Sequence, residues 1–144
     1  MKYILEFVLA NIISFILSMV TSYLIVDISN KLYFSSYNGI FSIINAFVIP
    51  SLGSLIGIML FEKYCFKANL YALAIIFGFL MGELGVVLGI LLAHPIGRLL
   101  FCAISNDTTI HFIIFYLIAT FATLFCLSGY KLGMKIRKEK KNHY

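Results

Sequence analysis

Four long apolar runs constrain the fold of this chain more than any other feature of its sequence. They cover residues 3–26, 39–61, 69–93 and 110–130, and polar or charged segments separate them. A helix needs about 20 mostly apolar residues to cross the hydrocarbon core of a bilayer, and each run reaches that length. The sequence therefore predicts an all-α integral membrane protein, a single antiparallel bundle of four transmembrane helices.

The composition supports this class of protein. Hydrophobic residues make up 62% of the chain and charged residues only 12%. A soluble domain has about 45–50% apolar and about 25% charged residues, so the apolar excess is too large for a soluble core. Most of the chain is therefore expected to lie in lipid.

The distribution of basic residues predicts the orientation of the helices. If both chain ends lie on one side, nine of the eleven lysines and arginines fall on that side. Only Lys31 and Arg98 fall in the opposite loops. Basic residues are enriched in cytoplasmic segments, so we expect both termini in the cytoplasm and the protein in a bacterial inner membrane.

The basic tail 131–144 contains six of these basic residues. Since it directly follows an apolar run, it is expected to bind anionic lipid headgroups, which attract each basic charge by about 1 kcal/mol. No nucleic-acid-binding motif accompanies the positive charge, and we predict no nucleic-acid partner.

Glu83 is the main candidate functional residue. It lies near the middle of the run 69–93, where a carboxylate costs about 2.5–3.5 kcal/mol to insert. Three hypotheses follow: it binds a cation or cationic substrate, it takes up protons in a coupling step, or it only pairs with another polar group during assembly. Asn11, Asn45 and Ser51 are the polar residues predicted to complete such an ion, proton or substrate site. Glu6, one turn from the cytoplasmic end, is instead predicted to be interfacial and within reach of Lys2.

Small residues predict close packing between helices. The glycines of the run 69–93 recur at intervals of three or four residues and so share one helical face, and the run 39–61 carries a Gly-x-x-x-Gly motif. Small side chains let membrane helices approach closely, so we expect these two runs to form a tightly packed pair. A glycine-lined conduit is the alternative. The glycines concerned are Gly53, Gly57, Gly78, Gly82, Gly85 and Gly89.

Motifs for catalysis or cofactor binding are weak. No nucleotide-binding loop, zinc-protease motif or nucleophile elbow occurs, so we predict no enzymatic activity and no cofactor. His94, Asp107 and His111 form a weak metal-site candidate, because two imidazoles and a carboxylate suit a transition metal. No disulfide is expected between the three cysteines, Cys65, Cys102 and Cys126.

Two functions fit this pattern. The first is a small transporter, channel or ion-coupling subunit whose site includes Glu83. The second is a non-catalytic assembly, accessory or immunity-type protein that binds another membrane protein through its glycine face. A unit of four helices can hardly enclose a path for a large substrate by itself. We therefore expect the protein to form a homo-oligomer or to be a subunit of a membrane complex.

Overall fold

A computed structural model describes residues 2–32, 38–66, 71–103 and 107–142, which form four helices. The helices are α1 (Lys2–Leu32), α2 (Asn38–Phe66), α3 (Ala72–Ala103) and α4 (Asp107–Asn142). Each contains a stretch that is long and apolar enough to cross a membrane, which confirms the predicted class of protein. These stretches are Lys2–Leu24, Ala46–Tyr64, Ala72–Ala93 and Phe112–Ile136.

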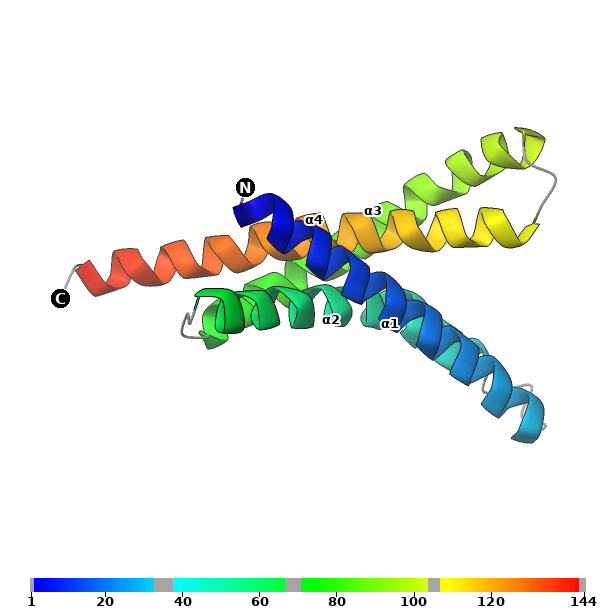
Figure 1. Cartoon of the computed structure of the whole chain (residues 1–144), viewed down its shortest axis with the longest axis horizontal. Helices are drawn as coiled ribbons and strands as arrows, with labels where there is room; N and C mark the ends of the chain where they lie inside the picture. The colour runs from blue at the N-terminus through cyan, green and yellow to red at the C-terminus, as the bar shows by residue number, and fades with distance from the viewer. Residues whose placement is uncertain (1, 33–37, 67–70, 104–106, 143–144) are drawn as a thin grey trace.

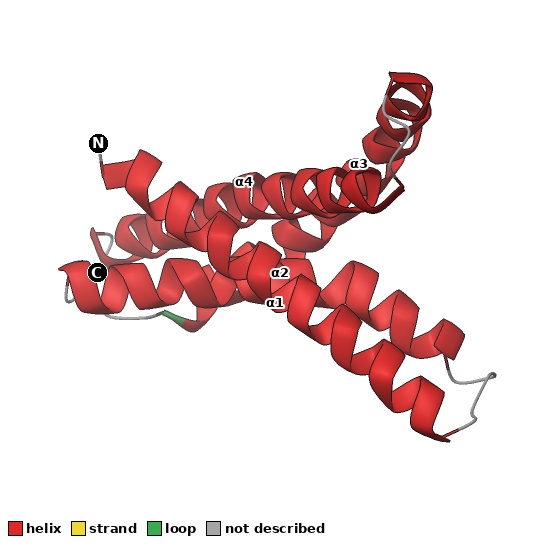
Figure 2. Cartoon of the chain, turned by 45° about the vertical axis from the view of Figure 1, so that its right-hand side comes forward, coloured by secondary structure: helices red, strands yellow, loops and turns green. Residues whose placement is uncertain are grey.

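The helices associate mainly in two pairs. α1 packs along α2, and α3 packs along α4, while contacts between the two pairs are less extensive. Figure 1 shows that the pairs meet at the end where both chain termini lie and separate toward the other end. Figure 2 shows the same arrangement from a second direction. We call these two ends the closed end and the open end.

Two apolar clusters explain why the molecule is closed at one end only. The first cluster includes Ala10, Ile58, Ala74 and Tyr130, and so draws on all four helices near the closed end. The second cluster has its buried residues in α3 and α4 alone, with the half-buried Phe47 of α2 packed against it. The helix pairs are thus held together by the first cluster and are less constrained beyond the second.

The side chains are distributed as a membrane protein requires. Many large apolar side chains face outward on every helix, including Ile4 and Ile16 of α1. The opposite face of α1 buries Glu6, Ser14 and Ser18. A lipid exterior tolerates the outward apolar residues, whereas the polar groups must find partners between the helices. This distribution agrees with an integral membrane protein.

The glycines of α2 approach α1. A Cβ atom at Gly57 would lie 2.6 Å from Cα of Ala10, and one at Gly53 would lie 2.7 Å from Cα of Ser14. Such distances leave no room for a side chain, so the two backbones are in direct contact. The expectation that these glycines pack against the third span is therefore wrong: their partner is the first span.

The glycine face of α3 is divided between two neighbours. Gly78 and Gly82 lie against Leu55 and Ser51 of α2 as well as against α4. Further along the helix the nearest atoms belong to α4, where the backbone of Phe121 would lie 2.5 Å from a Cβ atom at Gly85. Gly89 likewise contacts α4, and Gly129 and Gly133 of α4 contact α3 in return. Close packing is thus strongest between α3 and α4, which the sequence pattern did not predict.

Candidate functional site

Glu83 lies where α3 passes the middle of α2. Its side chain is half-buried, and its Oε1 atom accepts a hydrogen bond from the hydroxyl of the buried Ser51. The same hydroxyl lies 3.0 Å from the carbonyl oxygen of Val48, one turn earlier in α2. A serine hydroxyl has a single hydrogen, so these two oxygens are alternative acceptors for it.

Pro50 shapes α2 next to this site. It lies inside the helix, and because proline has no amide hydrogen it removes one backbone hydrogen bond there. In Figure 1 the two halves of α2 run in different directions. The carbonyl oxygen of Pro50 accepts hydrogen bonds from Ser14 of α1 and from Ser54, both at 2.7 Å. The proline thus joins α1 to α2 while Ser51 faces α3.

Further polar contacts connect α4 to the first helix pair. Ser54 and Thr123 share a buried hydrogen bond of 2.9 Å between their hydroxyls. Asn11 donates to Thr120 at 3.2 Å, and the Oδ1 atom of Asn11 is buried without a hydrogen-bond partner in the described part of the chain. These contacts hold the centre of the four-helix packing together.

The residues predicted to surround Glu83 are only partly brought together. Ser51 is its hydrogen-bond partner, whereas Asn11 bonds to α4 instead. Asn45 belongs to α2, but its side chain lies outside the described part of the structure. No lysine or arginine of the described residues forms an ion pair with Glu83. The carboxyl is therefore held by a neutral donor and carries no protein counter-charge among these residues.

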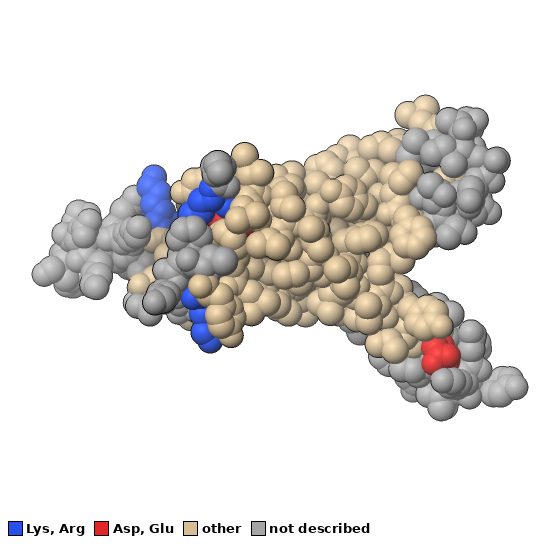
Figure 3. All heavy atoms as spheres, in the orientation of Figure 1, with Lys and Arg blue, Asp and Glu red and all other residues tan. Residues whose placement is uncertain are grey.

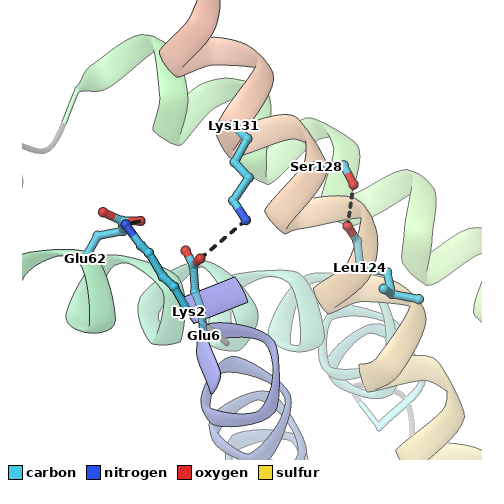
Figure 4. Close-up of polar contacts among 6 residues, drawn as sticks. All are labelled: Lys2, Glu6, Glu62, Leu124, Ser128 and Lys131. Carbon is cyan, nitrogen blue, oxygen red and sulfur yellow. Dashed lines mark hydrogen bonds and ion pairs between the residues drawn. The ribbon is translucent and has the colours of Figure 1, made fainter. Parts of the chain in front are cut away.

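A second group of ionisable residues lies at the closed end. This four-charge cluster consists of Lys2, Glu6, Glu62 and Lys131 (Figure 4). Lys131 Nζ lies 3.4 Å from Glu6 Oε2, and Lys2 Nζ lies 3.2 Å from Glu62 Oε1. The Glu6 side chain is fully buried.

The prediction that Glu6 is interfacial is therefore wrong. Its partner is on α4, because α4 crosses α1 at this level and covers the carboxyl. One signal in the sequence pointed to this burial: Glu6, Ala10, Ser14 and Ser18 recur every four residues. Residues four apart share a helical face, so Glu6 continues the stripe that α1 buries.

The remaining candidate residues lie near the open end or alone in the core. His94 belongs to α3, and Asp107 and His111 belong to α4, but their side chains lie outside the described part of the structure. Among the residues that are described, no group of potential metal ligands occurs. Cys126 is a free, buried thiol.

The surface charge agrees with a membrane-embedded middle. Figure 3 shows basic residues at the closed end, whereas the middle of the visible face carries neither basic nor acidic side chains. The exposed large side chains of this middle region are apolar, such as Leu80, Leu84 and Leu124. Fold and surface together define a small polytopic membrane protein with one carboxyl at mid-span. No family model, no curated protein and no solved structure matches this chain.

Proposed function

We propose that this protein is a small transporter, channel or ion-coupling subunit in which Glu83 binds and releases a proton. The observation that carries the proposal is the position of the Ser51 hydroxyl between the Glu83 carboxylate and the Val48 carbonyl oxygen. An ionisable residue at mid-membrane depth is itself a candidate for an ion or proton site.

Ser51 satisfies both protonation states of Glu83. When the carboxyl is ionised, the Ser51 O–H donates to Oε1. When a proton adds to the carboxylate, the new carboxyl O–H donates to Ser51 Oγ, and the serine hydrogen turns toward the Val48 carbonyl oxygen. Uptake and release of the proton then need only one hydroxyl rotation, and no buried polar atom loses its partner.

The surroundings of Glu83 favour exchange over a permanent structural role. Since the described residues offer no basic side chain as a counter-ion, the ionised form is not locked by a salt bridge. The side chain is also half-buried rather than fully enclosed by the helices. A small cation in place of the proton is the nearest variant of this mechanism.

We further propose that the closed end faces the cytoplasm of a bacterial cell, with the protein in its inner membrane. The basic residues at this end support that orientation. The tail 131–144 then lies against anionic lipid headgroups. A half-exposed carboxyl at mid-span is costly against lipid, which favours a homo-oligomer or a complex whose next subunit covers Glu83.

The alternative function, docking of another membrane protein on the glycine face, has less support. That face is occupied inside the chain, since every glycine proposed for it is buried against a neighbouring helix. These residues are Gly53, Gly57, Gly78, Gly82, Gly85 and Gly89.

Proton flux into liposomes tests the proposal. Purified protein is reconstituted with a pH-sensitive dye inside, and a potassium gradient with valinomycin supplies the driving potential. We expect flux from the wild-type protein and none from Glu83→Gln. Ser51→Ala removes a hydrogen bond to a charged group, about 1.5 kcal/mol or more, and should slow the flux about tenfold or more.

Ser128→Ala is the matched control for Ser51→Ala. Ser128 is exposed, and its hydroxyl donates to the carbonyl oxygen of Leu124 within its own helix, at 2.8 Å. Its removal should leave the flux unchanged. A folded Glu83→Gln protein that conducts protons like the wild type would refute the proposal, and a flux that strictly requires Na⁺ would assign Glu83 to a cation instead.

A further inference from the structure

The two ion pairs of the four-charge cluster connect different parts of the fold. Lys2 and Glu62 join α1 to α2, so their ion pair lies within one helix pair. Lys131 and Glu6 join α4 to α1, so their ion pair bridges the two helix pairs. Figure 4 shows the Lys131 side chain reaching down from α4 toward Glu6, with Lys2 and Glu62 beside it. Opening of the closed end would have to break this bridging ion pair.

Glu6 is poorly satisfied for a buried carboxylate. Neither of its oxygens accepts a well-formed hydrogen bond from the described part of the chain. The 3.4 Å ion pair is long beside the ~2.7–2.9 Å of a strong charge-assisted hydrogen bond. The nearby Tyr130 hydroxyl is likewise buried without a partner. A buried charge with a single distant partner repays little of its desolvation penalty, so the ionised state here is only weakly favoured.

We propose that Glu6 is a second proton-binding site and that its protonation releases Lys131, which separates the two helix pairs at the closed end. The proton comes from water at this end and adds to one carboxylate oxygen of Glu6. This inference does not depend on what Glu83 binds.

Lys131 has an alternative position once Glu6 is neutral. It keeps its three hydrogens and its charge throughout the step. Its side chain is already 35% exposed, and its ammonium lies 3.5 Å from the ring centroid of Tyr3. The Tyr3 ring belongs to α1 and stabilises the cation only while the two helices stay together. When the helix pairs separate, the released ammonium therefore leaves this ring as well and moves into the water that already reaches it.

The other charged groups around Glu6 do not replace this switch. α1 contributes Lys2 and α2 contributes Glu62, and these two neutralise each other. α4 contributes Tyr130 in addition to Lys131. Tyr71, which directly precedes α3, interacts electrostatically with Tyr130. Protonation of Glu6 therefore leaves the Glu6–Lys131 pair with a net positive charge.

The weak association of membrane helices makes this ion pair decisive. Lipid tails are as apolar as the helix surfaces, so the hydrophobic effect does not hold the helix pairs together. Packing in the first apolar cluster and the polar contacts between helices must do so, and the Lys131–Glu6 ion pair is the charged one of these contacts that joins the two helix pairs. The pairs already diverge at the open end (Figures 1 and 3). Loss of the bridging ion pair would let the closed end diverge as well.

Electron-spin distance measurements test the proposal on the full chain in lipid nanodiscs. Spin labels at Ile4 of α1 and Leu132 of α4, both exposed, report the separation of the helix pairs at the closed end. The three native cysteines are first replaced by alanine. We expect a short distance between the labels at about pH 9 and a longer one at about pH 5. The change should spread over about two pH units, as expected when a single group binds one proton.

Three variants make the test specific. Glu6→Gln should show the long distance at every pH, because its side chain is permanently neutral. Glu62→Gln, the same substitution in the ion pair within α1 and α2, should keep the pH response. Should Glu6→Gln fail to fold, Lys131→Met removes the same ion pair from the more exposed side and should also abolish the response. A wild-type distance that is constant over this pH range, or a response lost equally in Glu62→Gln, overturns the proposal.

Discussion

Gly129 offers a sharp test of how α3 and α4 pack. A Cβ atom at this position would overlap the carbonyl oxygen of Phe77 and would lie 2.7 Å from Cβ of Met81. Both opposing atoms belong to α3: the first is a backbone atom, and the second is bonded directly to the backbone. A rotamer change therefore cannot remove the overlap. We therefore expect that Gly129→Ala pushes the two helices apart and destabilises the protein.

The size of the effect follows from two opposing terms. Ordinary van der Waals contact of a Cβ atom begins at 3.4 Å, so the helices must separate by about 0.7 Å or more around Gly129. A gap of about 0.5–1 Å forfeits a quarter to a half of each contact's attraction, and overpacking costs about 1–3 kcal/mol. Because backbone atoms oppose the new methyl group, the cost should be near about 3 kcal/mol. The better helix propensity of alanine offsets about 1 kcal/mol, which leaves a net loss of about 2 kcal/mol.

Equilibrium unfolding in mixed detergent and dodecyl sulfate micelles measures this loss. The chain has nine tyrosines and no tryptophan, so tyrosine fluorescence follows the transition. A loss of about 2 kcal/mol lowers the ratio of folded to unfolded protein about 30-fold. Ser128→Ala also introduces an alanine, but at the exposed position one residue earlier. It should change the stability by less than about 0.5 kcal/mol. A Gly129→Ala protein as stable as the wild type, with a neutral Ser128→Ala control, would show that α3 and α4 do not approach closely at this glycine.

Two further predictions concern contacts of α2. A double-mutant cycle with Ser54→Ala and Thr123→Ala should give a coupling of about 0.6 kcal/mol, as is usual for hydrogen bonds between membrane helices; zero coupling would mean that the 2.9 Å contact contributes nothing. Gly57→Ala should destabilise the α1–α2 contact by about 1–2 kcal/mol, because its methyl would lie 2.6 Å from Cα of Ala10. The same unfolding assay measures both, and an unchanged midpoint for Gly57→Ala would contradict the close approach of α1 and α2.

Glu83 could be identified as a candidate site residue from the sequence, whereas the burial of Glu6 could not. Glu83 was recognisable because it interrupts an apolar run at mid-depth, and Ser51 was one of three predicted partners. The position of Glu6, one turn from the end of its apolar run, predicts an interfacial side chain. Its burial depends on Lys131, a residue near the opposite end of the chain, and on the crossing of α1 and α4.

The amino-acid sequence is sufficient to predict four long apolar helices. Helix length and hydropathy are local properties. Each segment can span the bilayer on the strength of these properties alone, because its backbone polar groups are hydrogen-bonded within its own helix. Which helices are neighbours becomes clear in the three-dimensional packing alone, since Gly53 and Gly57 could have contacted any helix with small residues. Packing in lipid depends on the fit between faces from distant parts of the chain, and a one-dimensional pattern of small residues does not specify its partner.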